Sequence, residues 1–290
     1  LAVLFGFFMA WGVGANDVAN AMGTSVGSKA LTIFQAIIIA AIFEALGALL
    51  AGGQVTQTIR GKIIEASLFA TTPSLLVYGM LASLLAAGTW LIIASSFGWP
   101  VSTTHSIVGA VIGFALVALG VDAVHWWEVV NIALSWIITP IIALVIAYVL
   151  FRSVQWLIFE TDAPIKNARR YVPCYIFLVG MVLCLVTVFS GLKHVGLHFT
   201  VMFSIFLSFS VSVLMSIIGY YLLQRIPVSA DEKTALNLQV LEKMFSVLML
   251  FTACAMAFAH GSNDVANAIG PLAAVVSIVN SGGNVFANAP

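Results

Sequence analysis

The chain has 290 residues, of which 62% are hydrophobic and 8% charged, and its formal net charge is zero. Because a soluble domain carries roughly 25% charged residues, this composition predicts a polytopic membrane protein and excludes an ordinary soluble domain. Because the chain has no net positive charge to attract nucleic acid, no nucleic-acid partner is expected. The cysteines, Cys174, Cys184 and Cys254, lack the spacing of a metal site or a disulfide framework.

Apolar runs of about 20 residues, long enough to cross a bilayer as helices, recur along the chain. The complete spans are expected at Leu31–Gly52, Ser74–Phe97, Glu128–Phe151, Pro173–Ser190 and Thr200–Leu223. Pro140 predicts a kink in the third of these. The first run, Leu1–Val13, is too short alone, and Gly12 and Gly14 favour a broken helix there. Ile107–Val121 is also short, which favours a re-entrant hairpin or a second broken helix.

Two polar stretches, Arg152–Val172 and Gln224–Lys243, are the richest in lysine and arginine and are expected to be loops. The positive-inside rule places both of them in the cytoplasm. The chain starts at Leu1 within a hydrophobic run and without a methionine, which suggests a natural N-terminus further upstream.

One string of eight residues occurs twice, as Gly-Ala-Asn-Asp-Val-Ala-Asn-Ala at 14–21 and Gly-Ser-Asn-Asp-Val-Ala-Asn-Ala at 261–268. Such a repetition indicates an internal duplication. Each copy places a carboxylate and two amides within apolar sequence, where polar and ionisable groups are costly and usually functional.

In a helix, the polar residues of each copy share one face. They are Asn16, Asp17 and Asn20 in the first copy and Asn263, Asp264 and Asn267 in the second. One carboxylate with two amide oxygens suits a hard cation such as Na⁺, Mg²⁺ or Ca²⁺, and the absence of clustered His and Cys argues against zinc. The alternative is that these side chains only form hydrogen bonds between helices.

A second candidate segment is Pro100–His105, which follows Trp99 and supplies three consecutive hydroxyls, Ser102, Thr103 and Thr104. Ser102 or Thr103 can cap the helix that follows, whose N-terminus favours anions. The hydroxyls therefore predict an oxyanion site, with a purely capping role as the alternative. His105 and His260 have two interpretations each, as groups that bind or titrate and as packed, hydrogen-bonded histidines.

The only carboxylate of its span is Glu44, which either faces a cavity and pairs with a cation or proton, or bonds to a neighbouring helix. Asp17 and Asp264 would repel a divalent anion bound nearby, so a cation or a proton must neutralise them. This requirement is the logic of a cation-coupled anion symporter.

These motifs resemble the signatures of the inorganic phosphate transporter (PiT) family. The resemblance rests on 14–21, 261–268 and 100–105, on Ala255–His260 and Gly270–Pro271 around the second motif, and on Glu44 and Thr58–Arg60. It implies an all-α fold with two inverted repeats and broken or re-entrant helices, phosphate symport with Na⁺ or H⁺, no cofactor and no catalytic residue. It also implies a homodimer in the lipid bilayer of a cell membrane. The short Gln224–Lys243 loop resembles bacterial members, whose location would be the inner membrane.

The resemblance and the residue chemistry together divide the site residues between two ligands. Phosphate binding is expected of Ser102, Thr103, Thr104, Asn20 and Asn267. Cation binding is expected of Asn16, Asp17, Asn263, Asp264 and Glu44, with Asp17 and Asp264 as the metal ligands if the coupled ion is Na⁺. Alternative substrates are sulfate and a metal–phosphate complex, because relatives carry both.

Without the family resemblance, the residues also allow functions other than transport. Ser102 or Thr103 with His105 and an aspartate could form an intramembrane hydrolase, but a hydrolase needs one asymmetric nucleophile–base set and this chain duplicates its motif. An open anion channel conflicts with two aspartates in apolar sequence. The sequence has no Gly-x4-Gly-Lys-Ser/Thr motif, so ATP is not expected to be the direct energy source.

The duplication predicts three regions: a first repeat at 1–151, intervening helices and loops at 152–243, and the start of a second repeat at 244–290. The family repeats the hydroxyl-rich segment after the second motif, and none lies between Ala268 and Pro290. Because an inverted-repeat transporter needs both halves, further membrane segments are expected beyond Pro290.

Overall fold

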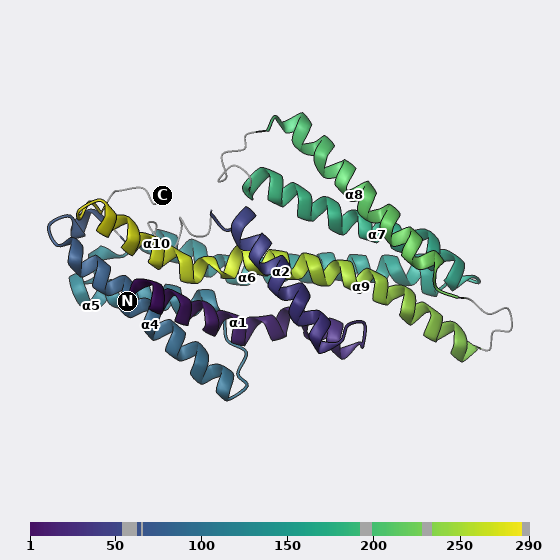
Figure 1. The fold of residues 1–290 in the computed structure, drawn as a ribbon, viewed down its shortest axis with the longest axis horizontal. Helices are drawn as coiled ribbons and strands as arrows, with labels where there is room; N and C mark the ends of the chain where they lie inside the picture. The colour runs from purple at the N-terminus through teal and green to yellow at the C-terminus, as the bar shows by residue number, and fades with distance from the viewer. Residues whose placement is uncertain (54–62, 65, 192–198, 228–233, 286–290) are drawn as a thin grey trace. The chain divides into compact units, whose positions relative to one another are not determined.

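The structure is a computed structural model that describes residues 1–53, 63–64, 66–191, 199–227 and 234–285. The main helices are α1 (Ala2–Gly27), α2 (Ile33–Ala51), α4 (Pro73–Ser96), α5 (Thr103–Leu119), α6 (Trp126–Val154), α7 (Pro164–Val186), α8 (Val201–Gln224), α9 (Thr234–Asp264) and α10 (Ala266–Asn280). They are drawn in Figure 1. Within the described ranges, β-type pairing is limited to an isolated bridge between Ile64 and Val124.

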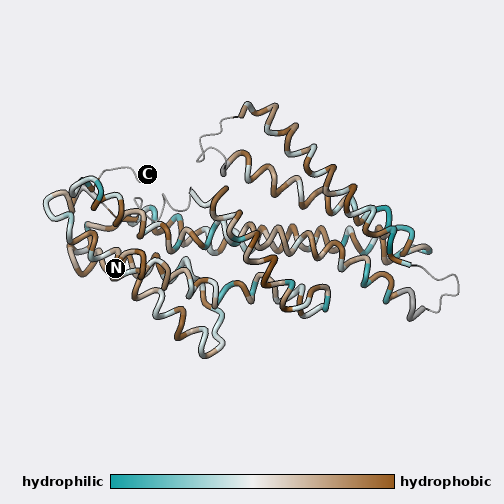
Figure 2. The backbone as a smooth tube through the Cα atoms, viewed as in Figure 1, coloured by the Kyte–Doolittle hydropathy of each residue, from teal (hydrophilic) through white to brown (hydrophobic). Residues whose placement is uncertain are grey.

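Seven helical stretches of the described chain are long and apolar enough to cross a membrane. Figure 2 shows hydrophobic residues along most of their length. The prediction of an all-α, multi-pass membrane protein is therefore confirmed. One stretch, Leu238–Asn280, has 43 residues. At 1.5 Å per residue it would be about 64 Å long, roughly twice the thickness of the bilayer core.

The predicted spans at Leu31–Gly52, Ser74–Phe97 and Thr200–Leu223 agree with α2, α4 and α8 to within two residues. The predicted break in the first run is wrong, because α1 is continuous through Gly12 and Gly14. Gly12 instead permits close packing, since a Cβ on it would lie 3.2 Å from the Cβ of Leu91 in α4. Gly12 is therefore explained by the close contact between α1 and α4 and not by a break in α1.

The predicted Arg152–Val172 loop is also wrong in most of its length. Helix α6 runs to Val154 and continues as a π-helix, Gln155–Phe159, while α7 begins at Pro164, nine residues before the predicted span. Lysine and arginine are good helix formers, so they mark where a helix leaves the apolar layer and not where it ends. Pro164 suits the first turn, where its missing N–H costs nothing.

Parts of other predictions lie outside the described residues. These parts are 54–62 and residue 65 of the polar stretch after α2, 192–198 of the short Gly191–Phe199 segment, 228–233 of the Gln224–Lys243 loop, and 286–290. Helix α9 begins at Thr234, so the second half of the predicted Gln224–Lys243 loop is helical.

The chain forms two compact units that interleave along the sequence. The first contains Leu1–Ala21, Glu44–Ala133 and Phe258–Pro290, and in it α4 packs against α5 and α10 around Met9, Met80, Leu84 and Ile107. The second contains Met22–Phe43 and Leu134–Ala257, and in it α7 packs along α8. The two units are defined by contacts between residues, whereas the three regions predicted above were defined by the repeated motif. The division into those three regions therefore stays a prediction.

Candidate functional site

The site is built in the first unit, where the connection between α4 and α5 is fixed by the first motif copy. The buried Asn16 of α1 donates from Nδ2 to Ser95 Oγ and to the carbonyl of Trp99, each at 3.2 Å. Its Oδ1 accepts from the Val101 N–H at 3.4 Å. Asn16 therefore satisfies backbone and hydroxyl groups that lie just before α5.

The start of α5 has the cap that the sequence predicted. Gly98 adopts a positive φ of 68° after α4, and Trp99 lies outside both helices. Ser102 is the N-cap, and its Oγ accepts from the His105 N–H at 3.2 Å. This cap orients the next two residues, Thr103 and Thr104, at the positive end of the helix.

Both threonines contact the second motif copy. Thr103 and Thr104 donate from Oγ1 to the same carboxylate oxygen, Asp264 Oδ1, at 3.4 and 3.3 Å. Asn267 Nδ2 lies 3.1 Å from Thr103 Oγ1, 3.0 Å from Thr104 Oγ1 and 3.2 Å from Asp264 Oδ1. Asn267 is fully buried and Thr103 is 2% exposed. We call these four residues the hydroxyl–amide cluster.

The amide oxygen of Asn267 is buried and accepts no hydrogen bond from the described residues. A buried acceptor without a donor or a cation is costly. Pro271 adds to this, because it has no N–H to give to the backbone carbonyl of Asn267, four residues earlier. The second motif copy therefore presents one unpaired amide oxygen beside the threonines, next to a backbone carbonyl that lacks its usual helical donor.

A histidine connects this cluster to two further carboxylates. His260 Nδ1 lies 2.9 Å from Glu44 Oε1, and its Nε2 lies 3.4 Å from Asp264 Oδ2 and 3.7 Å from Asp17 Oδ2. The ligand atoms of Asp17, His260 and Asp264 all lie within 4.8 Å of one another. Three carboxylates thus surround one imidazole, which can neutralise at most one of their charges. We call this group the carboxylate–histidine cluster.

Two glycines allow α2 and α9 to bring Glu44 to His260. A Cβ on Gly47 would overlap the backbone of Phe258, and a Cβ on Gly261 would overlap the backbone of Glu44. Small residues of this kind let membrane helices approach closely. The glycine that opens the second motif copy therefore has a packing role, whereas Gly14, its counterpart in the first copy, meets nothing within 4 Å in the described structure.

The two motif copies also differ in their backbone. The first lies inside the continuous helix α1, whereas the second is divided between α9 and α10 at Val265. Val265 keeps helical angles, but the N–H groups of Ala268 and Ile269 both bond to its carbonyl. The second copy therefore contains a local irregularity between two helices, at a position where no break was expected from the sequence.

Six of the residues proposed from sequence meet here: Asp17, Glu44, Thr103, Thr104, Asp264 and Asn267. Ser102 is occupied as a cap and Asn16 as a brace of the α4–α5 connection. Asn20 and Asn263 are exposed, and Asn20 Nδ2 donates only weakly, at 3.4 Å, to the Asn16 carbonyl. The central position of His260 was not predicted, although its spacing of four residues from Asp264 was a usable signal.

Comparisons with known proteins relate the chain to phosphate transporters. The sequence pattern of the phosphate transporter family matches residues 13–289. The chain is 53% identical over 286 residues to a protein of Haemophilus influenzae named as a phosphate permease, covering 98% of the chain and 68% of that protein. It is 40% identical to the chloroplastic inorganic phosphate transporter 2-1 of Arabidopsis thaliana, covering 97% of the chain and 50% of that protein.

The chain is also similar to a solved structure titled "The sodium-dependent phosphate transporter", with a TM-score of 0.90 and 36% sequence identity. The similarity covers 100% of this chain and 70% of the chain in that structure. The predicted fold class and the prediction of a transporter rather than an enzyme are thereby confirmed. With the family pattern matching nearly all of its length, the chain belongs to the phosphate transporter family.

Proposed function

We propose that the whole protein moves inorganic phosphate across the membrane by symport with Na⁺, and that the hydroxyl–amide and carboxylate–histidine clusters bind the two ions side by side. The observation that carries the proposal is the shared use of Asp264. Its Oδ1 accepts from Thr103 and Thr104, and its Oδ2 faces His260. One carboxylate therefore belongs to both clusters.

The hydroxyls explain why a cation must bind with the anion. Each threonine hydroxyl has one proton to donate, and both protons point to Asp264. Phosphate needs those protons, and the Asp264 charge repels it. A cation on the Asp264 oxygens neutralises the charge and releases both hydroxyls, so the anion site forms only after the cation has bound.

The cation would lie between the aspartates of the two motif copies. Asp17 Oδ2 and Asp264 Oδ2 both lie near His260 Nε2, and carboxylate oxygens are the ligands that hard cations prefer. The unpaired Asn267 oxygen offers a further ligand of the same kind. The similar structure whose title names sodium dependence favours Na⁺ over H⁺, although a proton could neutralise the same oxygens.

The remaining residues have supporting roles in this proposal. Glu44 would hold His260 by the 2.9 Å contact, while Ser102 and Asn16 fix the start of α5. Ion binding by Asn20 and Asn263, and a homodimer in the bilayer, stay predictions.

The test is uptake of labelled phosphate into proteoliposomes that contain the purified whole protein, with the Na⁺ and pH gradients imposed separately. Accumulation driven by inward Na⁺ at equal pH supports the proposal, and unlabelled phosphate should compete better than sulfate. Accumulation driven only by a pH gradient would replace Na⁺ by H⁺. Equilibration without accumulation under either gradient would contradict symport.

A further inference from the structure

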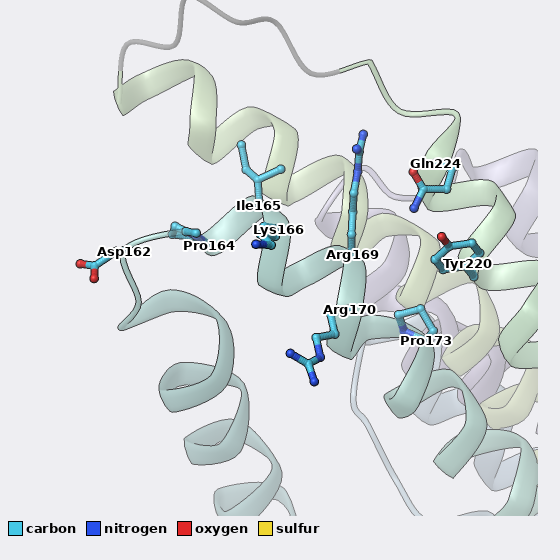
Figure 3. A pocket seen from close by; sticks show the side chains of 10 residues that line it. Asp162, Pro164, Ile165, Lys166, Arg169, Arg170, Pro173, Tyr220 and Gln224 are labelled. Atoms are coloured by element: carbon cyan, nitrogen blue, oxygen red, sulfur yellow. The ribbon is translucent and has the colours of Figure 1, made fainter.

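A cavity of about 750 Å³ lies in the second unit, between the start of α7 and the end of α8. Its lining includes Lys166, Arg169 and Arg170 of α7 and Tyr220 and Gln224 of α8, and the site is shown in Figure 3. The volume is typical of a pocket for a small organic ligand. None of these residues belongs to the transport site proposed above.

The cavity has an excess of positive charge. The ionisable lining residues among those described are Lys166, Arg169, Arg170 and a single carboxylate, Asp162, which points away from the three cations in Figure 3. None of the three cations forms an ion pair with a described residue. Cations that line one cavity without a carboxylate partner favour an anionic ligand.

Two groups in the cavity wall need a hydrogen-bond acceptor. Arg169 is held in place by donation from Nη2 to the Ile226 carbonyl at 2.9 Å, but its buried Nε has no partner among the described residues. Helix α7 starts without a side-chain cap and without an acidic residue in its first turn, so its first N–H groups lack acceptors within the helix. The first turn, Pro164–Lys166, itself lines the cavity. Both features suit the oxygens of a phosphate group.

The surroundings place this cavity at the edge of the membrane. The neighbouring tyrosines, Tyr220 and Tyr221, are 46% and 64% exposed near the end of α8, a helix that is long and apolar enough to cross a membrane. Exposed aromatic residues at the end of an apolar span are typical of the membrane–water interface, and the lysine and arginine content indicates the cytoplasmic side. Lys166 and Arg170 are exposed, so their long side chains can close on a ligand that approaches from this interface.

We propose that this cavity binds a phosphate-ester anion at the cytoplasmic membrane surface. The same chemistry is offered by the headgroup of an anionic lipid and by soluble phosphate. The volume favours the headgroup, because inorganic phosphate alone would leave most of the cavity unfilled. The site is separate from transport, and its occupancy would anchor the α7–α8 pair to the cytoplasmic leaflet.

The experiment measures binding of phosphatidylglycerol to the purified whole protein by native mass spectrometry, with phosphatidylcholine as the zwitterionic comparison. The variants are Lys166→Gln, Arg170→Gln and both together. The matched control is Lys243→Gln, which removes one exposed charge from α9 outside the cavity. Each cavity substitution should weaken phosphatidylglycerol binding about fivefold and the pair about 25-fold, with no change in the control.

A second arm measures binding of labelled inorganic phosphate by equilibrium dialysis. If soluble phosphate is the ligand, the wild type has one more phosphate site than the double variant, and phosphatidylglycerol shows no preference over phosphatidylcholine. Circular dichroism checks that the variants keep their helix content. Unchanged binding of both phosphatidylglycerol and phosphate in the double variant would overturn the proposal.

Discussion

The close crossing of α2 and α9 at Gly261 predicts that two glycines at equivalent positions of the motif respond differently to substitution. Gly261 and Gly14 occupy the same position in the two motif copies. A Cβ on Gly261 would overlap the Glu44 backbone, whereas a Cβ on Gly14 would meet nothing within 4 Å among the described residues. Substitution of each glycine by alanine therefore tests the packing directly.

The magnitude follows from two opposing effects. Replacing glycine by alanine inside a helix stabilises that helix by about 1 kcal/mol at either position. Overpacking costs about 1–3 kcal/mol, and the upper end applies at Gly261 because helix backbone cannot rotate away. The helix contribution cancels between the two variants, so Gly261→Ala should be less stable than Gly14→Ala by about 3 kcal/mol. Separation of α2 from α9 should also lengthen the 2.9 Å contact between Glu44 and His260.

The assay compares the apparent melting temperature of each purified variant with phosphate uptake at matched protein levels. Gly261→Ala should melt several degrees lower than the wild type and lose most of its uptake. Gly14→Ala should match or exceed the wild type in melting temperature and retain uptake. Equal stability and equal uptake in the two variants would refute the reasoning about the helix crossing.

Substitutions at four further residues examine the site itself. Thr103→Val and Thr104→Val each remove one hydroxyl at nearly constant volume, so KM for phosphate should rise about 10- to 150-fold. The control is Ser106→Ala, because the hydroxyl of Ser106 donates to the Ser102 carbonyl. An unchanged KM in both valine variants would count against the anion site. Glu44→Gln should retain more uptake than Glu44→Ala, because an amide oxygen can still accept from His260 Nδ1; equal loss would show that the charge of Glu44 matters more than its hydrogen bond. Asn16→Ala should lower the free energy of unfolding by about 1–3 kcal/mol and leave the Na⁺ concentration for half-maximal uptake unchanged; a shifted Na⁺ dependence at normal stability would instead make Asn16 a cation ligand.

The membrane spans were predictable because each needs about 20 apolar residues, a requirement that is visible in composition alone. Helix ends were less predictable, as the early start of α7 at Pro164 shows. Lysine and arginine are good helix formers and are also common at the membrane interface. A helix end that projects from the membrane therefore has the same composition as a cytoplasmic loop. The hydroxyl-rich start of α5 was predictable because a serine cap has a local sequence signal.

The assignment of individual motif residues was beyond sequence reasoning for a different reason. Asn16 and Asn20 both lie on the helix face of Asp17, but only Asn16 meets the end of α4. Which residue of a helix face meets a partner depends on where the partner crosses, and that information lies in another segment. The same limit applies to Gly14 and Gly261, which are identical in the motif and differ in their neighbours.

The most direct test of the proposed coupling is phosphate uptake as a function of Na⁺ concentration for wild type, Asp17→Asn and Asp264→Asn at matched protein levels. Asparagine keeps the shape of aspartate and one acceptor oxygen, and it removes the charge that the cation would neutralise. If the two aspartates hold the cation, both variants should lose or flatten the Na⁺ dependence while expression is largely kept. Wild-type Na⁺ dependence in both variants would show that the duplicated motif only braces the helices and would contradict the proposed coupling.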